Sequence, residues 1–135
     1  MDDSGFLCLP GGYVELGETT EEAMRKELLE EIGEKFEIDK YLGVVENYFI
    51  NKYAKKIHEI SFYYLMTPIE KIDTNNNFTI IENDKGRKIK LDIKWIDLKE
   101  IKNYDIRPSI LKQILESKNL EFNHLILNEL DKIGC

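Results

Sequence analysis

One continuous stretch, from Gly12 to Gly33, joins a glycine-containing loop directly to a helix rich in acidic side chains. Thr19 is followed three residues later by Glu22, a spacing typical of a capping box, so a helix is predicted to begin near Thr20. Gly33 suits the left-handed backbone conformation that ends many helices. A tight loop, in which the backbone can approach a ligand closely, is therefore expected to lead at once into a helix.

The predicted helix has two distinct faces. Glu27, Glu30 and Glu31 lie three and four residues apart and so share one face. A separate apolar stripe, expected to face a core, consists of Met24, Leu28 and Ile32. Each like-charged pair on an exposed helix costs only about 0.2–0.5 kcal/mol, so a solvated acidic face would explain the helix taken alone. The adjoining glycine loop favours a cation-binding site over a merely solvated face. Carboxylate and backbone carbonyl oxygens are the ligands of hard cations such as Mg²⁺ or Mn²⁺.

Length and composition limit the kind of protein. With 135 residues, of which 42% are hydrophobic and 33% charged, the chain is expected to form a single soluble globular domain spanning residues 1–135. No apolar run approaches membrane-spanning length, and no basic region precedes an apolar run at the amino terminus. A net charge of -7 without a basic stripe argues against a nucleic-acid polymer as partner. We expect neither a membrane nor a nucleic acid to be bound.

The two cysteines, Cys8 and Cys135, form no disulfide framework and have no partner at zinc-binding spacing. Cys8 is expected to be a small strand residue and Cys135 a frayed terminal thiol. Such usage suits a reducing compartment, and a cytoplasmic location is the corresponding prediction.

The rest of the chain alternates strand and helix signals without repeats. Strands are predicted over residues 6–9, 41–50, 57–66, 78–81 and 88–96, with Asp84-Lys85-Gly86 as the turn of a hairpin between the last two. Pro108 suits the first turn of a helix that runs to about Ser117. Apolar residues at roughly helical spacing predict a final helix over residues 121–133. This order favours an α/β (α+β) fold in which a mixed β-sheet lies between helices.

The stretch from Gly12 to Gly33 resembles the Nudix box, a long pattern of glycines and glutamates at fixed spacing. The matching residues are Gly12, Glu18, Glu27, Leu28, Glu30, Glu31 and Gly33. Two positions depart from the pattern, with Lys26 in place of the usual arginine and Glu34 in place of an aliphatic residue. In the family that arginine helps hold the box carboxylates. Lysine lacks a planar two-pronged donor, so we expect looser orientation of the acids and a lower rate.

The resemblance also implies a fold, a mixed sheet sandwiched between helices. Family members normally place about two strands before the glycine loop, whereas only about ten residues precede it here. The chain is therefore expected to be an N-terminally truncated or divergent Nudix-like domain that lacks N-terminal strands. Missing strands would expose a sheet edge and part of the core, which would favour a homodimer.

The activity implied by the resemblance is metal-dependent cleavage, by water, of the diphosphate linkage in a small nucleoside diphosphate derivative. Glu27, Glu30 and Glu31 would bind Mg²⁺ or Mn²⁺, with the backbone carbonyl of Gly11 as a further ligand. Glu18 would support these ligands. No residue is assigned to binding the substrate, because aromatic residues on strands usually belong to the core.

The general base is expected outside the box, as it often is in the family. Glu82, beside the predicted hairpin turn, and Glu59, on a predicted strand, are the candidates, although a solvent-facing role would explain either residue. His58 adjoins Glu59, but neighbours on a strand point to opposite faces. Alternation instead predicts that His58 packs on the same face as Ile60, Phe62 and Tyr64.

Two other classes of protein compete with the hydrolase. A non-catalytic Nudix-like domain that binds a ligand or a partner would explain Lys26 and the missing strands, but it has no need of three glutamates in the box. A simple calcium-binding protein is disfavoured because the acidic residues lie on a helix and not at alternating positions of a loop.

Overall fold

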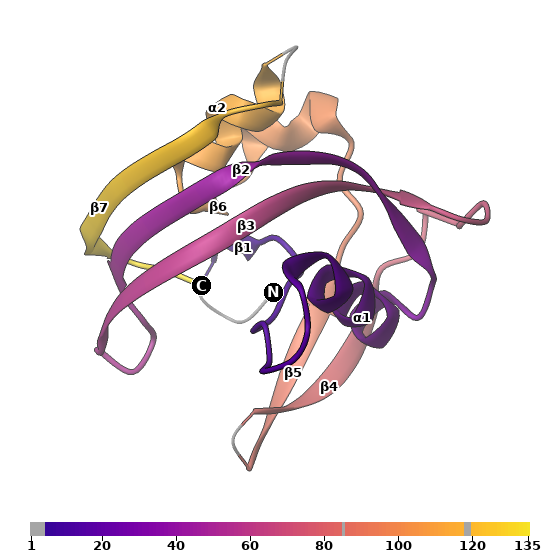
Figure 1. The fold of residues 1–135 in the computed structure, drawn as a ribbon, viewed down its shortest axis with the longest axis horizontal. Helices are drawn as coiled ribbons and strands as arrows, with labels where there is room; N and C mark the ends of the chain where they lie inside the picture. The colour runs from indigo at the N-terminus through magenta and orange to yellow at the C-terminus, as the bar shows by residue number, and fades with distance from the viewer. Residues whose placement is uncertain (1–4, 85, 118–119) are drawn as a thin grey trace.

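The computed structural model describes residues 5–84, 86–117 and 120–135. Within these ranges, ten elements follow one another along the chain (Figure 1). They are β1 (Leu7–Cys8), α1 (Thr20–Ile32), β2 (Phe36–Ile50), β3 (Lys56–Pro68), β4 (Phe78–Asp84), β5 (Arg87–Ile93), the 3-10 helix η1 (Leu98–Asn103), β6 (Ile106–Arg107), α2 (Ile110–Glu116) and β7 (Asn123–Ile133). No helix in the described ranges is both long enough and apolar enough to span a membrane.

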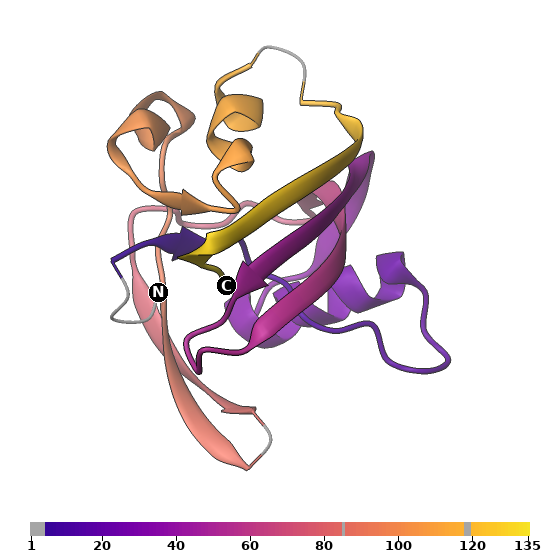
Figure 2. The same cartoon turned by 90° about the vertical axis from the view of Figure 1, so that its left-hand side faces the viewer.

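The strands form three small sheets, and the largest has the order β3-β2-β7. The central strand β2 runs antiparallel to β3 and parallel to β7, so the expectation of a mixed sheet is confirmed. Helix α2 and η1 lie on one side of this sheet and α1 on the other (Figures 1 and 2). Strands β4 and β5 form the predicted hairpin, although Lys85 of its expected turn lies outside the described residues. Strand β1 pairs with β6 in parallel over two residues.

Helix α1 has the ends that its sequence predicts. The side chain of Thr19 accepts a hydrogen bond from the backbone N–H of Glu22 at 3.1 Å, which satisfies one donor of the first turn. Gly33 adopts φ +82°, and its N–H donates to the carbonyl of Leu29. Both ends of the helix are thus fixed by local hydrogen bonds, and its acidic residues are held at defined positions.

The core lies on one face of the sheet, where alternate side chains of β2 are buried. Val45 is 1% exposed, and Asn47 and Phe49 follow it on the same face. A cluster formed by Ile101, Ile106 and Leu111 packs with Tyr63 of β3, so η1, β6 and α2 cover this inner face. Helix α2 begins at Ile110, two residues after Pro108, which lies before the helix and not in its first turn.

The helix predicted over residues 121–133 is wrong, because β7 occupies this segment. The side chain of Leu125 faces inward, whereas its neighbour Ile126 is 69% exposed, as alternation in a strand requires. Pairing with β2 satisfies backbone groups along an edge that would otherwise be open, and this tertiary gain outweighs a loose helical spacing. Strand β7 thereby covers one edge of β2.

The expectation that His58 is packed in the core is also wrong. His58 lies on the outer face of the sheet, where it stacks on Tyr48 with ring centroids 4.2 Å apart and contacts Glu46. Its expected neighbours Ile60 and Phe62 are exposed on the same face. The inner face is taken by the alternate residues of β3, so apolar character did not identify the buried side of this strand.

The two cysteines do not remain separate thiols, because Cys8 and Cys135 form a disulfide across a sequence separation of 127 residues. Cys8 pairs with Arg107 in the β1–β6 ladder, and the Arg107 guanidinium donates to the carbonyl of Ile133 at 2.8 Å. These contacts bring the end of β7 to β1. Because the two cysteines lie far apart in the sequence, their pairing could not be predicted from it. The inference of a reducing compartment depended on unpaired cysteines and is no longer supported.

The two faces of the sheet predict different responses to truncation. Val45→Ala removes two buried methyl groups and is expected to lower the free energy of unfolding by about 2 kcal/mol. Ile126→Ala, on the outer face of the adjacent strand, is the control and should change it by less than about 0.5 kcal/mol. Urea denaturation measures both values, and equal losses would contradict the assignment of the faces.

Candidate metal centre

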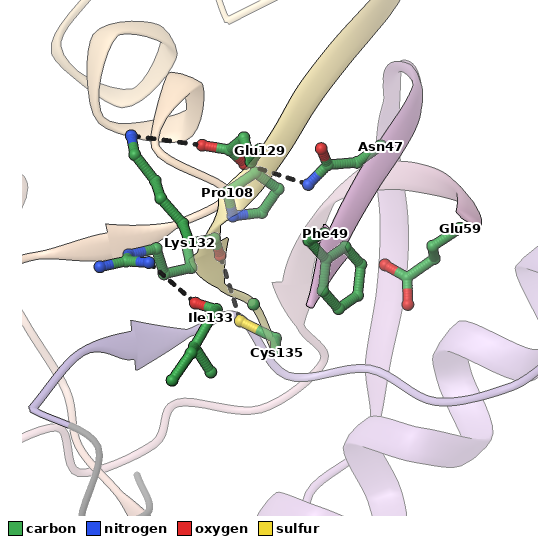
Figure 3. Close-up of a pocket in the computed structure, with 10 residues that line it drawn as sticks. Asn47, Phe49, Glu59, Pro108, Glu129, Lys132, Ile133 and Cys135 are labelled. Carbon is green, nitrogen blue, oxygen red and sulfur yellow. Dashed lines mark hydrogen bonds and ion pairs between the residues drawn. The ribbon is translucent and has the colours of Figure 1, made fainter. Parts of the chain in front are cut away.

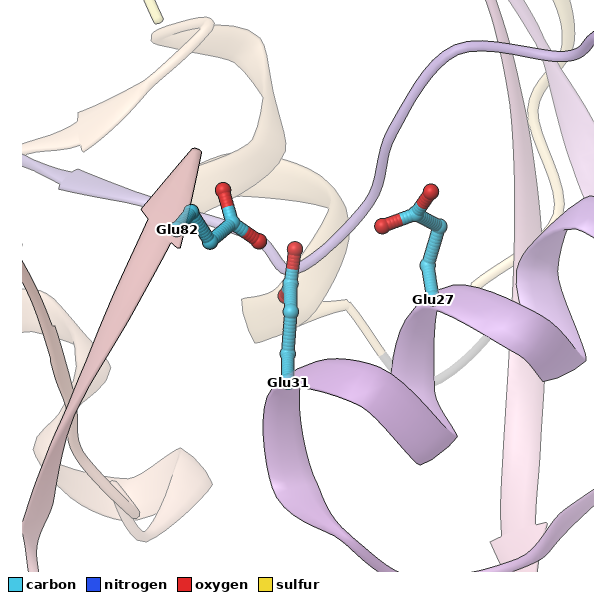
Figure 4. A group of neighbouring side chains, drawn as sticks. All are labelled: Glu27, Glu31 and Glu82. Carbon is cyan, nitrogen blue, oxygen red and sulfur yellow. The ribbon is translucent and has the colours of Figure 1, made fainter. Parts of the chain in front are cut away.

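Three carboxyl groups from two elements meet beside the glycine loop. Glu27 and Glu31 project from α1, and Glu82 approaches them from β4 (Figure 4). Carboxylate oxygens of the three residues lie within 4.8 Å of one another. Glu27 and Glu31 are four residues apart on one face of the helix, as predicted, while the β4–β5 hairpin brings in Glu82.

These carboxyl groups are close enough to oppose one another's ionisation. Burial of Glu31, which is 5% exposed, raises its pKa to about 8, and the charges of Glu82 and Glu27 add to this effect. Burial also raises the pKa of Glu27, with contributions from the charges of Glu30 and Glu82.

No lysine or arginine within residues 5–84, 86–117 and 120–135 forms an ion pair with Glu27, Glu31 or Glu82. The described part of the cluster therefore has no directly paired side-chain cation, and the more distant charge of Lys26 does not outweigh the effects that raise the pKa of Glu27. A divalent cation with a preference for oxygen ligands fits such a donor set, because it supplies the missing positive charge.

The glycine loop lies directly against one member of the cluster. A Cβ atom added at Gly12 would overlap the carboxyl group of Glu27, whereas one added at Gly11 would meet no atom within 4 Å. The absence of a side chain at Gly12 thus allows backbone and carboxylate to share the space. Gly11 is exposed beside this contact, and the binding of a cation by its carbonyl oxygen stays a prediction.

Glu30 is exposed and lies outside the group of three. Its charge contributes to the raised pKa values of Glu27 and Glu31, so it is a near neighbour of the cluster. The role of Glu30 as a ligand stays a prediction.

Lys26 fastens the glycine loop to α1. Its Nζ lies 3.1 Å from Oε2 of Glu18 and 3.6 Å from Oε2 of Glu15. A hydrogen bond from the backbone N–H of Glu15, followed by the contact with Lys26, holds the pKa of Glu18 below its usual value. The lysine therefore forms an ion pair with the box carboxylate Glu18 and holds the downstream end of the glycine loop against α1.

Glu59, the other candidate base, is not among the three clustered carboxylates. It accepts a hydrogen bond from Ser61 at 2.8 Å and lines a cavity of about 20 Å³ together with Asn47, Phe49 and Glu129 (Figure 3). That volume suits a single water molecule. Glu59 is thus directed to a different place from Glu82.

A buried polar network lies beside this cavity, and the sequence analysis does not predict it. Asn47 donates to Glu129 at 3.0 Å, and Ser109 Oγ donates to the other oxygen of Glu129 at 2.5 Å. Burial acts to raise the pKa of Glu129, but these hydrogen bonds outweigh it and lower the pKa. The segment was predicted to be helical, so no inward position was assigned to Glu129.

A family model described as the NUDIX domain matches residues 2–116, which include the glycine loop, α1 and Glu82. Strand β7 follows the matched range. No curated protein matches the chain.

A matched pair of glycine variants tests the contact between loop and helix. Gly12→Ala is expected to displace the flexible Glu27 carboxyl group and to weaken Mn²⁺ binding at least about tenfold, with little effect on unfolding. Gly11→Ala has open space for its methyl group and keeps the backbone carbonyl that is the predicted ligand, so its affinity for Mn²⁺ should stay within about twofold of that of the unmodified protein. Isothermal titration calorimetry measures both affinities, and equal binding by the two variants would contradict the role of Gly12.

The raised pKa of Glu31 predicts a dependence of stability on pH. Between about pH 4.5 and 8 the folded chain binds a proton at Glu31 that the unfolded chain has released, so this residue lowers the stability of the metal-free protein as pH rises through that range. Glu31→Gln removes the penalty and should stabilise the metal-free protein by about 1–2 kcal/mol at pH 9, with little change at pH 4.5.

Denaturant unfolding in the presence of a chelator measures this difference. The exposed Glu34, just beyond the end of α1, provides the control. Glu34→Gln should show no comparable gain at pH 9. A Glu31→Gln protein that is no more stable than the unmodified one at pH 9 would refute the burial of an ionisable carboxyl group at this position.

Proposed function

The chain belongs to the Nudix family, a family of the pyrophosphohydrolase type, and on that premise we propose that it is a metal-dependent hydrolase of acid anhydrides. Its reaction is the cleavage of a diphosphate linkage in a small nucleoside diphosphate derivative, with water as the nucleophile. The observation that carries the proposal is the meeting of Glu27, Glu31 and Glu82 beside the glycine loop.

The carboxylates of Glu27 and Glu31 bind Mg²⁺ or Mn²⁺, and Glu30 and the carbonyl of Gly11 complete the ligand set. Two observations support this assignment, the raised pKa of the buried Glu31 and the close approach of Gly12 to Glu27. When bound, the cation neutralises phosphate charge and lowers the pKa of the attacking water. The glycine loop fixes the backbone beside these ligands.

Glu82 acts as the general base. It comes from β4 and not from the helix that carries the other two carboxylates, so it lies beside Glu31 on the side away from Glu27 (Figure 4). In this position its carboxylate accepts a proton from the water that attacks phosphorus, while the bond between phosphorus and the bridging oxygen breaks. Glu59 has no such support, because its carboxyl group lies elsewhere.

The substrate is a small molecule, and no particular nucleoside diphosphate derivative is assigned. The proposal retains a cytoplasmic location, where the state of Cys8 and Cys135 would depend on the reductants present. A homodimer is also retained, with support from apolar side chains exposed on the outer face of the sheet, which include Ile60, Phe62 and Ile126.

The alternative is a Nudix-like domain that only binds a ligand or a partner. Two observations weaken the reasons for it. Strand β7 pairs with one edge of the central strand β2, and Lys26 pairs with a box carboxylate. Turnover separates the two functions, since a binding domain would bind the nucleotide and leave it intact.

Turnover of a panel of nucleoside diphosphate derivatives tests the proposal in the presence of Mg²⁺ or Mn²⁺. Glu31→Gln and Glu82→Gln are each expected to lower kcat about 100-fold or more, because one variant loses a ligand and the other loses the base. Glu30→Gln should also lower turnover, because Glu30 belongs to the proposed ligand set.

Glu34→Gln supplies the control, since it removes the same charge from an exposed position close to the cluster. Its kcat should stay within about twofold of that of the unmodified protein. Turnover that survives both Glu31→Gln and Glu82→Gln, or that persists in excess chelator, would refute the proposed function.

A further inference from the structure

The chain's two cysteines join the segment that enters the glycine loop to the segment that follows β7. Cys8 is the last residue of β1 and lies four residues before Gly12. The Cys8–Cys135 disulfide is therefore close, along the backbone, to the position where the loop contacts Glu27.

Besides the disulfide, this end of the loop is held by a short ladder and by the packing of Leu7 against the cluster of Ile101, Ile106 and Leu111. Strand β1 forms only a two-residue ladder with β6, reinforced by a hydrogen bond of 2.8 Å from the N–H of Leu7 to the carbonyl of Asp105. Phe6, just before it, is buried under the guanidinium of Arg107 at 4.8 Å. A covalent bond is a large addition to such a short ladder.

The loop itself has little support between its two ends. Residues 9–18 contain no helix or strand, and several of their large apolar side chains point into solvent. The downstream end is held by Lys26 through Glu18 and Glu15. The upstream end is held at Cys8, so the backbone at Gly12 is positioned by one anchor on each side.

The other half of the disulfide is fixed to the core. Gly134 donates its N–H to the carbonyl of Ile50 at 2.9 Å, and it lies so close to the ring of Phe49 that a Cβ atom would overlap it. Figure 3 shows Cys135 beside Phe49 and Ile133. The disulfide therefore links Cys8, at the upstream end of the loop, to a segment that is held against the buried strand β2.

We propose that the Cys8–Cys135 disulfide positions the glycine loop at the candidate metal centre, and that its reduction weakens the binding of a divalent cation there. The inference deepens the proposed function and rests on it. In the reduced chain the upstream anchor is weakened to the short β1–β6 ladder and the packing of Phe6 and Leu7, and residues 9–12 gain conformational freedom. Binding of the cation must then order them, and that entropic cost lowers the affinity.

The chemical step is thiol–disulfide exchange with a dithiol reductant. A thiolate of the reductant attacks one sulfur of the disulfide and forms a mixed disulfide, which its second thiol resolves. Two electrons and two protons pass to Cys8 and Cys135, and the reductant becomes a disulfide. The step is reversible, so the affinity of the centre for a cation follows the redox state of its surroundings.

Calorimetry of Mn²⁺ binding to the full chain tests the inference. Three samples are compared: the oxidised protein, the reduced protein and the Cys8→Ser/Cys135→Ser variant. The reduced protein is prepared with dithiothreitol, which is then removed under anaerobic conditions. The oxidised protein should bind Mn²⁺ about tenfold more tightly than the reduced protein. The double variant should bind as the reduced protein does and should not respond to reductant. Circular dichroism confirms that each sample is folded.

Pro10→Gly loosens the chain between Cys8 and Gly12 and leaves the disulfide intact. If the disulfide acts through this segment, the variant binds Mn²⁺ more weakly when oxidised and loses less affinity on reduction. Amide hydrogen exchange without metal gives a readout that does not depend on the proposed function. Exchange within residues 9–18 should rise on reduction, while that of β2 and β3 should not.

The outcomes separate the two claims. Absence of Mn²⁺ binding in every redox state would refute the proposed function, whereas equal affinity in folded oxidised and reduced protein would overturn this inference alone. Global unfolding on reduction would overturn it as well, because the disulfide would then stabilise the whole fold and not the loop.

Discussion

The crowding of carboxyl groups at the last turns of α1 is the constraint on which the rest of the structure depends. Glu31 is buried beside Glu27 and Glu82, and this position raises its pKa to about 8. A chain gains nothing in stability from such a cluster, because like charges repel and burial penalises each ionised group. A bound divalent cation would reverse the sign of these interactions. The stability that the fold loses at this site is consistent with a function that needs a cation there.

The surrounding elements hold the cluster from three directions. Helix α1 is fixed by the Thr19 and Gly33 caps, and the β4–β5 hairpin brings Glu82 to it. The glycine loop closes the third side, with its backbone at Gly12 against Glu27. Local hydrogen bonds are enough for the helix, whereas the hairpin and the loop depend on tertiary contacts. Differences in the rigidity of these supports would change the affinity for a cation without changing any ligand.

Local signals predicted α1 and the β4–β5 hairpin, because capping residues and strand alternation act over a few residues. They could not predict β7, whose pairing with β2 depends on an open edge far away in sequence. The same limit applies to the Cys8–Cys135 disulfide. At the site, the spacing of Glu27 and Glu31 gave their common face, but the approach of Glu82 follows from how the hairpin packs. The position of His58 was not predictable from alternation, because the apolar face of β3 that carries Ile60 and Phe62 is the exposed one.

The central claim is that a divalent cation binds to the carboxylates of Glu27 and Glu31, beside Glu82. A crystal structure of the protein soaked in Mn²⁺, with the ion located by its anomalous scattering, tests it most directly. The account predicts an anomalous peak among the three side chains, within about 2.5 Å of carboxylate oxygens of Glu27 and Glu31. A peak elsewhere, or full binding of Mn²⁺ with these carboxylates left unligated, would contradict it.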